Sequence, residues 1–216
     1  MLEELPAEAR VLLLPTSEGP SVLYGASPEF ALTKFDEIVH PEAFVYVEDR
    51  SAEVWVREII ARHNEGQTVM SRIKISPVGP ANVVAMMGKL AHDKKLPQPG
   101  LAVLDGDQPK AIGCVTLPGN DAPERVVFVG LKAHNWGLLH ERFGIGAGNL
   151  HTYLEDALPL LNPDFHQWPS SVGDRILKSA TSVWETMATE WCRVCLNDVD
   201  RDAIVDAIQA ALPSGV

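Results

Sequence analysis

The feature that most constrains this chain is a run of apolar residues that ends in two carboxylates. Leu101-Ala-Val-Leu104 is opened by Gly100 and followed at once by Asp105-Gly106-Asp107, a pattern typical of a buried strand. Carboxylates at the end of such a strand repel one another and lose hydration, so they need a cation, a basic partner or open water. Gly106 lets the backbone turn so that both side chains can approach one point.

A second acidic strand end lies upstream. Phe44-Val45-Tyr46-Val47 runs directly into Glu48 and Asp49. The intervening pattern predicts a helix, a strand and a helix, over residues 51–63, 69–75 and 80–91. This alternation is typical of an α/β fold whose parallel strands are joined by right-handed crossovers. Functional groups of a parallel sheet gather beyond the carboxyl ends of its strands. If the first and third strands are neighbours, Glu48, Asp105 and Asp107 converge.

Carboxylate ligands without histidine or cysteine suit Mg²⁺ or Mn²⁺ rather than zinc. Taken alone, Asp105-Gly106-Asp107 is also compatible with a solvated turn after a strand. A phosphoaspartate receiver is a further alternative, because it also collects acids at strand ends. It needs a lysine at a later strand end, and neither Lys110 nor Lys132 stands convincingly in that place. The pairing of two acidic strand ends therefore favours a metal site.

Length and charge limit the possible partners. The 216 residues suit one α/β domain with a smaller appended unit. A net charge of −11 argues against wrapping nucleic acid by bulk electrostatics, but not against an enzyme that meets a phosphodiester through bound metal. We expect no membrane association, because no apolar run approaches the length of a membrane helix. The three cysteines and the absence of a signal-peptide pattern predict a cytoplasmic protein.

The pattern along the chain divides it into three parts. Residues 1–40 form a lead-in segment, residues 41–130 a catalytic domain, and residues 131–216 a helical unit with a C-terminal helix packing on it. Within the lead-in we expect a buried strand or helix end, a loop and a short helix, over residues 11–14, 15–21 and 28–35. Beyond the aspartate strand, two further strands are predicted, over residues 112–117 and 126–129.

Several short motifs follow one another along the chain: Val47-Glu48-Asp49, Asp105-Gly106-Asp107, Leu117-Pro-Gly119, Pro123-Glu124 and Asp164-x-His166-x-Trp168. The first two, with the strand and helix alternation between them, resemble a Toprim domain, the catalytic module of topoisomerases, bacterial primases and some nucleases. The order of all five is similar to the C-terminal region of overcoming lysogenization defect (OLD) nucleases and related ATPase-coupled Toprim proteins. The resemblance covers roughly residues 20–200. It implies a Rossmann-like Toprim sheet, mainly parallel and flanked by helices, with an appended helical unit.

The resemblance also implies a reaction and partners. Glu48, Asp105 and Asp107 would hold Mg²⁺ or Mn²⁺ and cleave DNA. Three basic side chains are candidates for contacting the phosphate, namely Arg50, Arg125 and Lys178. The chain lacks a Gly-x-x-x-x-Gly-Lys-Ser/Thr loop, so the ATPase head of the family would be a partner, in cis or in trans. A homo-oligomer is a further expectation.

A second metal position is less well matched. Many OLD nucleases have glycine after the glutamate and another acid four positions after it, where this chain has Asp49 and Ala52. Glu53 lies one residue further, and a shift of one residue turns a helical side chain by about 100°. Asp49 and Glu53 are therefore candidates for the second metal position, while an i,i+4 ion pair between Glu53 and Arg57 is an equal alternative.

Three other patterns are interpreted without catalytic roles. Gly144-Ile-Gly-Ala-Gly-Asn149 follows a predicted helix rather than a strand, so it indicates a connector and not a dinucleotide loop. Cys192 and Cys195 indicate buried reduced thiols, because no second Cys-x-x-Cys completes a zinc site. The motif that contains His166 stands where the family's order of motifs places it. Two roles are open for His166, a functional one and one in packing the helical unit against the sheet.

These observations predict a metal-dependent DNA endonuclease module of an OLD-like ATPase-nuclease system, with phage defence or DNA processing as its context. The alternative is a docking or regulatory Toprim-like module that binds an ATPase head or another subunit without catalysis.

Overall fold

A four-stranded parallel sheet forms the centre of the computed structural model, which describes residues 6, 9–16, 19–36, 40–160 and 164–213. In the order β4-β3-β5-β6, its strands are β4 (Ile73–Pro77), β3 (Ala43–Val47), β5 (Gly100–Leu104) and β6 (Cys114–Thr116). β3 pairs with both β4 and β5. The strands that come first and third along the chain in this sheet, β3 and β5, are therefore neighbours. The predicted α/β class with a parallel sheet is confirmed.

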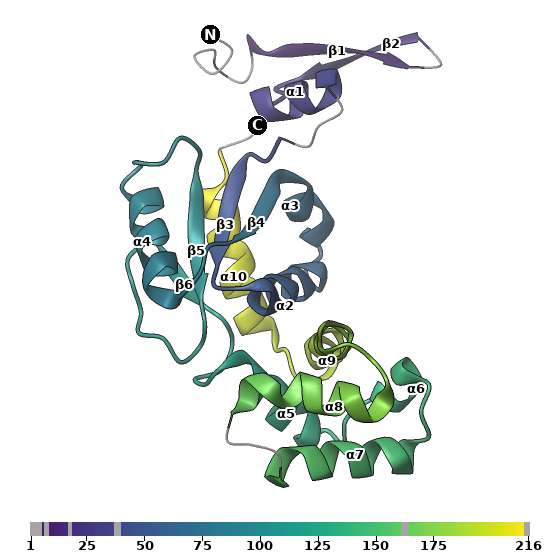
Figure 1. Cartoon of the computed structure of the whole chain (residues 1–216). Helices are drawn as coiled ribbons and strands as arrows, with labels where there is room; N and C mark the ends of the chain where they lie inside the picture. The colour runs from purple at the N-terminus through teal and green to yellow at the C-terminus, as the bar shows by residue number, and fades with distance from the viewer. Residues whose placement is uncertain (1–5, 7–8, 17–18, 37–39, 161–163, 214–216) are drawn as a thin grey trace.

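Helices cover both faces of the sheet (Figure 1). Successive side chains of a strand point to opposite faces, so Val45 packs in one apolar core and Tyr46 in another. The Val45 face is covered by α2 (Arg50–Ala61), α3 (Gly66–Arg72) and α10 (Asp198–Ala211). The Tyr46 face is covered by α4 (Ala81–His92).

A helical unit lies at the end of the sheet where β3 and β5 finish (Figure 1). It consists of α5 (Pro123–Ala133), α6 (Leu139–Phe143), α7 (Ala147–Leu160), the 3-10 helix η2 (Phe165–Gln167), α8 (Trp168–Ile176) and α9 (Ala180–Val194). Its α9 packs on α2, where Trp184 Nε1 donates to the carbonyl of Ser51 at 2.9 Å and Trp191 meets Trp55 edge to face.

The chain enters and leaves the helical unit at adjacent places. Residues 117–120 lead into it, and α10 carries the chain back to the sheet, where it contacts β5 and β6. The entering segment and the start of α10 border one groove of about 710 Å³, which Asn120 and Asp200 both line. The helical unit is thus an insertion between β6 and α10.

The N-terminal unit comprises β1 (Val11–Thr16), β2 (Gly19–Tyr24) and α1 (Pro28–Asp36). β1 and β2 pair as an antiparallel hairpin, and the unit stands apart from the rest of the molecule (Figure 1). The predicted helix begins as expected, because Ser27 Oγ accepts a hydrogen bond from the N–H of Phe30 at 3.1 Å. Many of its apolar side chains are exposed, including Leu13 and Tyr24 at 63% and 72%.

Within this N-terminal unit the loop predicted for residues 15–21 was wrong, and residues 11–14 form a strand as predicted but are mostly not buried. Within the segment expected to be a loop, the described residues extend β1 and form the start of β2. In Val11–Leu14, only Leu12 is buried, because a two-stranded hairpin without a covering layer leaves most of its side chains in water.

Two further predicted strands are partly or wholly helical. Residues 69–72 belong to α3, and β4 begins only at Ile73. Residues 126–129 lie in α5, where Val127 and Phe128 are buried and Val129 is 60% exposed. A short apolar run fits a buried strand and a buried helix equally well, and the proline at the start of α5 favours the helix.

Candidate metal centre at the carboxyl ends of β3 and β5

Two neighbouring parallel strands deliver acidic residues to the same edge of the sheet. Glu48 and Asp49 follow β3, and Asp105 follows β5. The backbone of Glu48 is held in place, because its carbonyl accepts a hydrogen bond from the N–H of Gly79 at 3.1 Å. This is the arrangement that the sequence pattern requires for shared chemistry at the strand ends.

Asp105 has the most unusual environment of these acids. Its Oδ1 is buried and has no hydrogen-bond partner among the described residues. The pKa of Asp105 is raised to about 7, mainly by burial and further by repulsion from four carboxylates, namely those of Glu48, Asp49, Asp107 and Glu124. A buried carboxylate oxygen without a donor is costly, and a cation would relieve both the desolvation and the repulsion.

Glu48, at the end of the neighbouring strand, is also surrounded by carboxylates. Burial raises its pKa, and repulsion from Asp49, Asp107 and Glu124 raises it further. His166 acts in the opposite direction and lowers the pKa of Glu48, because positive charge near a carboxylate favours its ionised form. We refer to the carboxylates of Glu48, Asp49, Asp105, Asp107 and Glu124 as the acidic centre.

The turn between the two aspartates packs against a second loop. A Cβ atom added to Gly106 would come within 2.5 Å of the carbonyl oxygen of Gly119. Glycine is therefore required here for a close approach between the loop after β5 and the Leu117-Pro-Gly119 loop. Asp107 lies on the exposed side of this turn, where its Oδ1 accepts a hydrogen bond from Gln108.

The two residues predicted for a second metal position differ in their surroundings. Asp49 caps α2 by accepting a hydrogen bond from the N–H of Ala52 at 2.9 Å, and it still contributes to the charge of the acidic centre. Glu53 is buried, and its carboxylate forms ion pairs with Arg50 at 2.7 Å and Arg57 at 3.0 Å. The alternative ion pair with Arg57 is thus present, and Glu53 would have to leave both arginines to bind a metal.

Sequence reasoning did not assign a site role to Glu124. This residue is 7% exposed in the first turn of α5, and its Oε1 lies 3.3 Å from Nδ1 of His166. Its carboxylate belongs to the acidic centre because it raises the pKa of both Asp105 and Glu48. The only signal in the sequence was the Pro-Glu pair, in which proline opens a helix and places glutamate in its first turn.

The Asp164-x-His166-x-Trp168 motif has a clear local basis. Asp164 caps η2 by accepting a hydrogen bond from the N–H of His166 at 3.2 Å. Trp168 is 9% exposed and packs against Phe128 of α5, with ring centroids 5.3 Å apart. His166, between these two anchors, therefore faces Glu124.

The basic candidates lie in three different environments. Arg125 follows Glu124 in α5, and its guanidinium lies over the ring of Phe165 at 5.1 Å. Arg50 begins α2 next to Asp49, with its guanidinium paired to Glu53. Lys178 lies in the turn after α8, and no described contact joins it to the acidic centre.

The chemistry of this site is that of hard oxygen ligands. Within the described part of the chain, no group of three or more His, Cys, Asp and Glu side chains is already arranged to hold a metal ion. The partnerless oxygen of Asp105 and the surrounding carboxylates nevertheless fit Mg²⁺ or Mn²⁺, which bind carboxylate oxygens and keep several water ligands. Side chains of the acidic centre would have to rotate to complete such a set.

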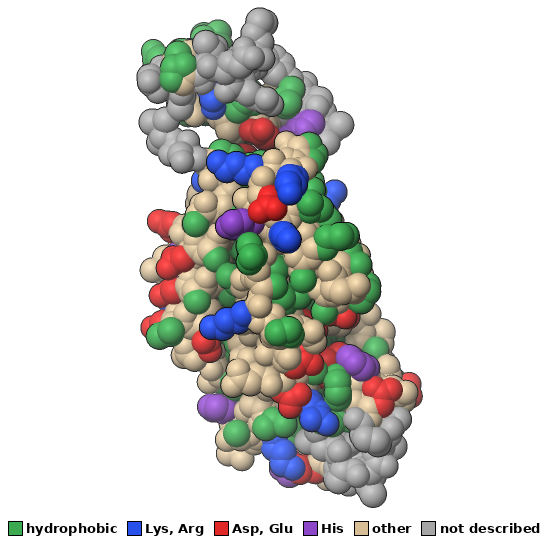
Figure 2. All heavy atoms as spheres, turned by 90° about the vertical axis from the view of Figure 1, so that its left-hand side faces the viewer, with side chains coloured by type: hydrophobic (Ala, Val, Ile, Leu, Met, Phe, Trp, Pro, Cys, Tyr) green, Lys and Arg blue, Asp and Glu red, His purple; other side chains and the backbone are tan. Residues whose placement is uncertain are grey.

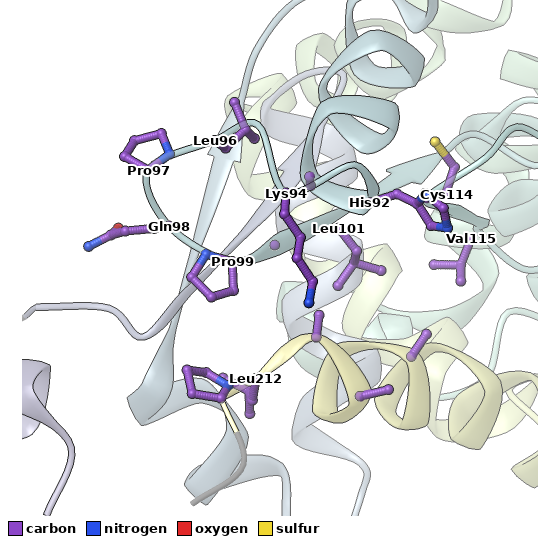
Figure 3. Close-up of a pocket in the computed structure, with 17 residues that line it drawn as sticks. His92, Lys94, Leu96, Pro97, Gln98, Pro99, Leu101, Cys114, Val115 and Leu212 are labelled. Atoms are coloured by element: carbon purple, nitrogen blue, oxygen red, sulfur yellow. The ribbon is translucent and has the colours of Figure 1, made fainter. Parts of the chain in front are cut away.

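A groove elsewhere in the fold is separate from this centre. It has a volume of about 830 Å³ and lies at the amino end of β5, between the loop after α4 and the end of α10 (Figure 3). Lys94 reaches across it, and its lining includes no carboxylate. On the face viewed in Figure 2, lysine and arginine side chains are scattered and do not form a single basic stripe.

Comparison of the chain with protein-family models, with curated proteins and with solved structures found no significant match. None of the described helices is long and apolar enough to cross a membrane.

Proposed function

We propose that this chain is a Mg²⁺- or Mn²⁺-dependent phosphodiesterase that cleaves DNA, acting as a Toprim module of the OLD type. The observation that carries the proposal is the buried Oδ1 of Asp105, which lacks a partner while several carboxylates surround it. The position of this oxygen beyond the carboxyl end of a parallel strand, next to Glu48, adds to the argument.

In this proposal Glu48, Asp105 and Asp107 hold the metal, which activates water and stabilises negative charge on the phosphate. Asp49 would contribute to a second metal position, and Glu53 would join it only after release from its arginines. Arg125 is adjacent in sequence to Glu124 of the acidic centre, and it would steady a phosphate oxygen. Arg50 and Lys178 remain further candidates for that role.

Loss of plasmid cleavage in one variant tests the proposal. The wild-type chain should nick or cleave plasmid DNA with Mg²⁺ or Mn²⁺ and not with EDTA, and Asp105→Ala should abolish this activity. Asp206→Ala, which changes an exposed aspartate of α10, is the matched control and should retain it. Equal activity of Asp105→Ala and the wild type, with both purified identically, would refute the assignment.

The second candidate function is a docking module that binds an ATPase head or another subunit. The exposed apolar side chains of the N-terminal unit favour it, among them Val11, Leu13 and Tyr24. Titration calorimetry with Mn²⁺ separates the two functions. A nuclease site should bind the metal with an affinity that collapses in Glu48→Ala, whereas a docking module has no need of metal.

The proposed setting is cytoplasmic phage defence or DNA processing, with the ATPase head in cis or in trans.

A further inference from the structure

We propose that Arg125, Phe165 and His166 form a stacking platform for an unpaired base, so that single-stranded or frayed DNA is preferred over intact duplex as substrate. This inference rests on the proposed function, because it names the form of nucleic acid that the acidic centre would receive.

Phe165 contacts both of the other side chains. The ring centroids of Phe165 and His166 are 4.3 Å apart, with their planes inclined by 50°. The guanidinium carbon of Arg125 lies 5.1 Å from the centroid of Phe165. Phe165 is partly buried beneath this arrangement. The side chains of His166 and Arg125 are 67% and 44% exposed, so their planar groups are accessible to a ligand.

The platform is held rigidly by the chain on both sides. Asp164 accepts hydrogen bonds from the N–H of His166 and from Nε2 of Gln167, at 3.2 and 3.0 Å. Trp168 fixes the start of α8 in the core. The imidazole is oriented by its contact with Glu124. A ring that is already ordered loses little conformational entropy when a base stacks on it.

The same contact places the platform at the rim of the acidic centre. Glu124 interacts with His166 through one oxygen and belongs to the acidic centre through its charge. A base on His166 would therefore belong to a nucleotide close to the phosphate at the centre. Bases inside a duplex are stacked on their neighbours and cannot reach such a ring, so the base must be unpaired.

The overall charge of the chain supports this reading. With a net charge of −11, the chain gains little from bulk attraction to the phosphate backbone of duplex DNA. Stacking on aromatic and arginine groups is tolerant of sequence and does not require a basic surface. The platform would thus supply binding that the surface charge does not.

Binding can be tested independently of cleavage. A single-stranded oligonucleotide carrying 2-aminopurine is titrated with the full chain in Ca²⁺, and its fluorescence should fall as the base stacks. His166→Ala should bind about tenfold more weakly or worse and lose the quenching, whereas His166→Phe should keep both. His151→Ala changes another exposed histidine and serves as the control, with circular dichroism confirming that each variant is folded.

Cleavage assays separate this inference from the proposed function. Wild type should cleave single-stranded and forked DNA faster than blunt duplex, and His166→Ala should lose that preference. Equal cleavage of duplex and single strands, dependent on Asp105, would overturn the platform while leaving the nuclease assignment intact. Quenching that depends on the ring at position 166, without any cleavage, would support the platform and contradict the nuclease assignment. Absence of quenching by the wild type would overturn the platform.

Discussion

At the scale of single residues, Asp105 opposes the stability of the fold in the absence of metal. Its pKa is raised to about 7 by burial and by neighbouring carboxylates, whereas an aspartate in the unfolded chain titrates near pH 4. The folded state therefore holds the proton that the unfolded state releases between these values, and stability falls as the pH rises from about 4 to about 7.

The variant Asp105→Asn should remove this loss. In EDTA at pH 8 we expect its free energy of unfolding to exceed that of the wild type by on the order of 1–3 kcal/mol, and the difference to shrink toward pH 4. Urea denaturation across this pH range measures it. Asp206→Asn is the exposed control. A wild type that is more stable to urea than Asp105→Asn at pH 8 would show that Asp105 is not strained by its neighbours.

At the scale of elements, one buried acid joins α6 to α9. Glu190 is fully buried and accepts hydrogen bonds from the N–H of Leu138 at 2.6 Å, from Arg142 at 2.8 Å and from Arg193. Burial alone would raise the pKa of Glu190, but these donors outweigh it and lower the pKa to about 2. The ionised form of Glu190 is therefore the one that the fold requires.

Replacing this acid should be costly. Glu190→Ala leaves the N–H of Leu138 and two half-exposed arginines without their acceptor, and we expect it to lower the free energy of unfolding by about 1–3 kcal/mol at pH 7. Because the folded pKa lies below the unfolded value, the contribution of Glu190 is present above about pH 4 and is lost as the pH falls toward 2. Urea denaturation at pH 7 and pH 3 tests both points. Glu185→Ala, on the exposed side of α9, should change little.

At the scale of the whole molecule, the N-terminal unit is separable from the core. The residues that form the two apolar cores all lie between Ala43 and Leu212. Deletion of residues 1–40 should therefore leave a chain that unfolds cooperatively at nearly the same urea concentration. It should also bind less 8-anilinonaphthalene-1-sulfonate, because exposed apolar side chains are removed. Loss of cooperative unfolding would show that the unit stabilises the sheet.

Much of the sheet could be predicted from the sequence because its signals are local. The apolar run before Asp105 and the run before Glu48 both became strands. Their adjacency was only a condition of the sequence argument, and the pairing of β3 with β5 meets it. The strand predicted at Val126–Val129 was wrong because four apolar residues do not distinguish a helix from a strand. The contact between Glu124 and His166 spans 42 residues, and no local pattern encodes such a separation.

The helical unit is attached to the sheet by two segments of chain that leave side by side, near Asn120 and Asp200. The insert is also held against the sheet by α9, whose Trp184 donates to Ser51 and whose Trp191 packs on Trp55 of α2. Glu124 and His166 form one wall of the acidic centre and belong to the insert. Glu48 and Asp105 form the other wall and belong to the sheet. The packing of α9 on α2 therefore sets the distance between the two walls, although neither helix carries a carboxylate of the acidic centre.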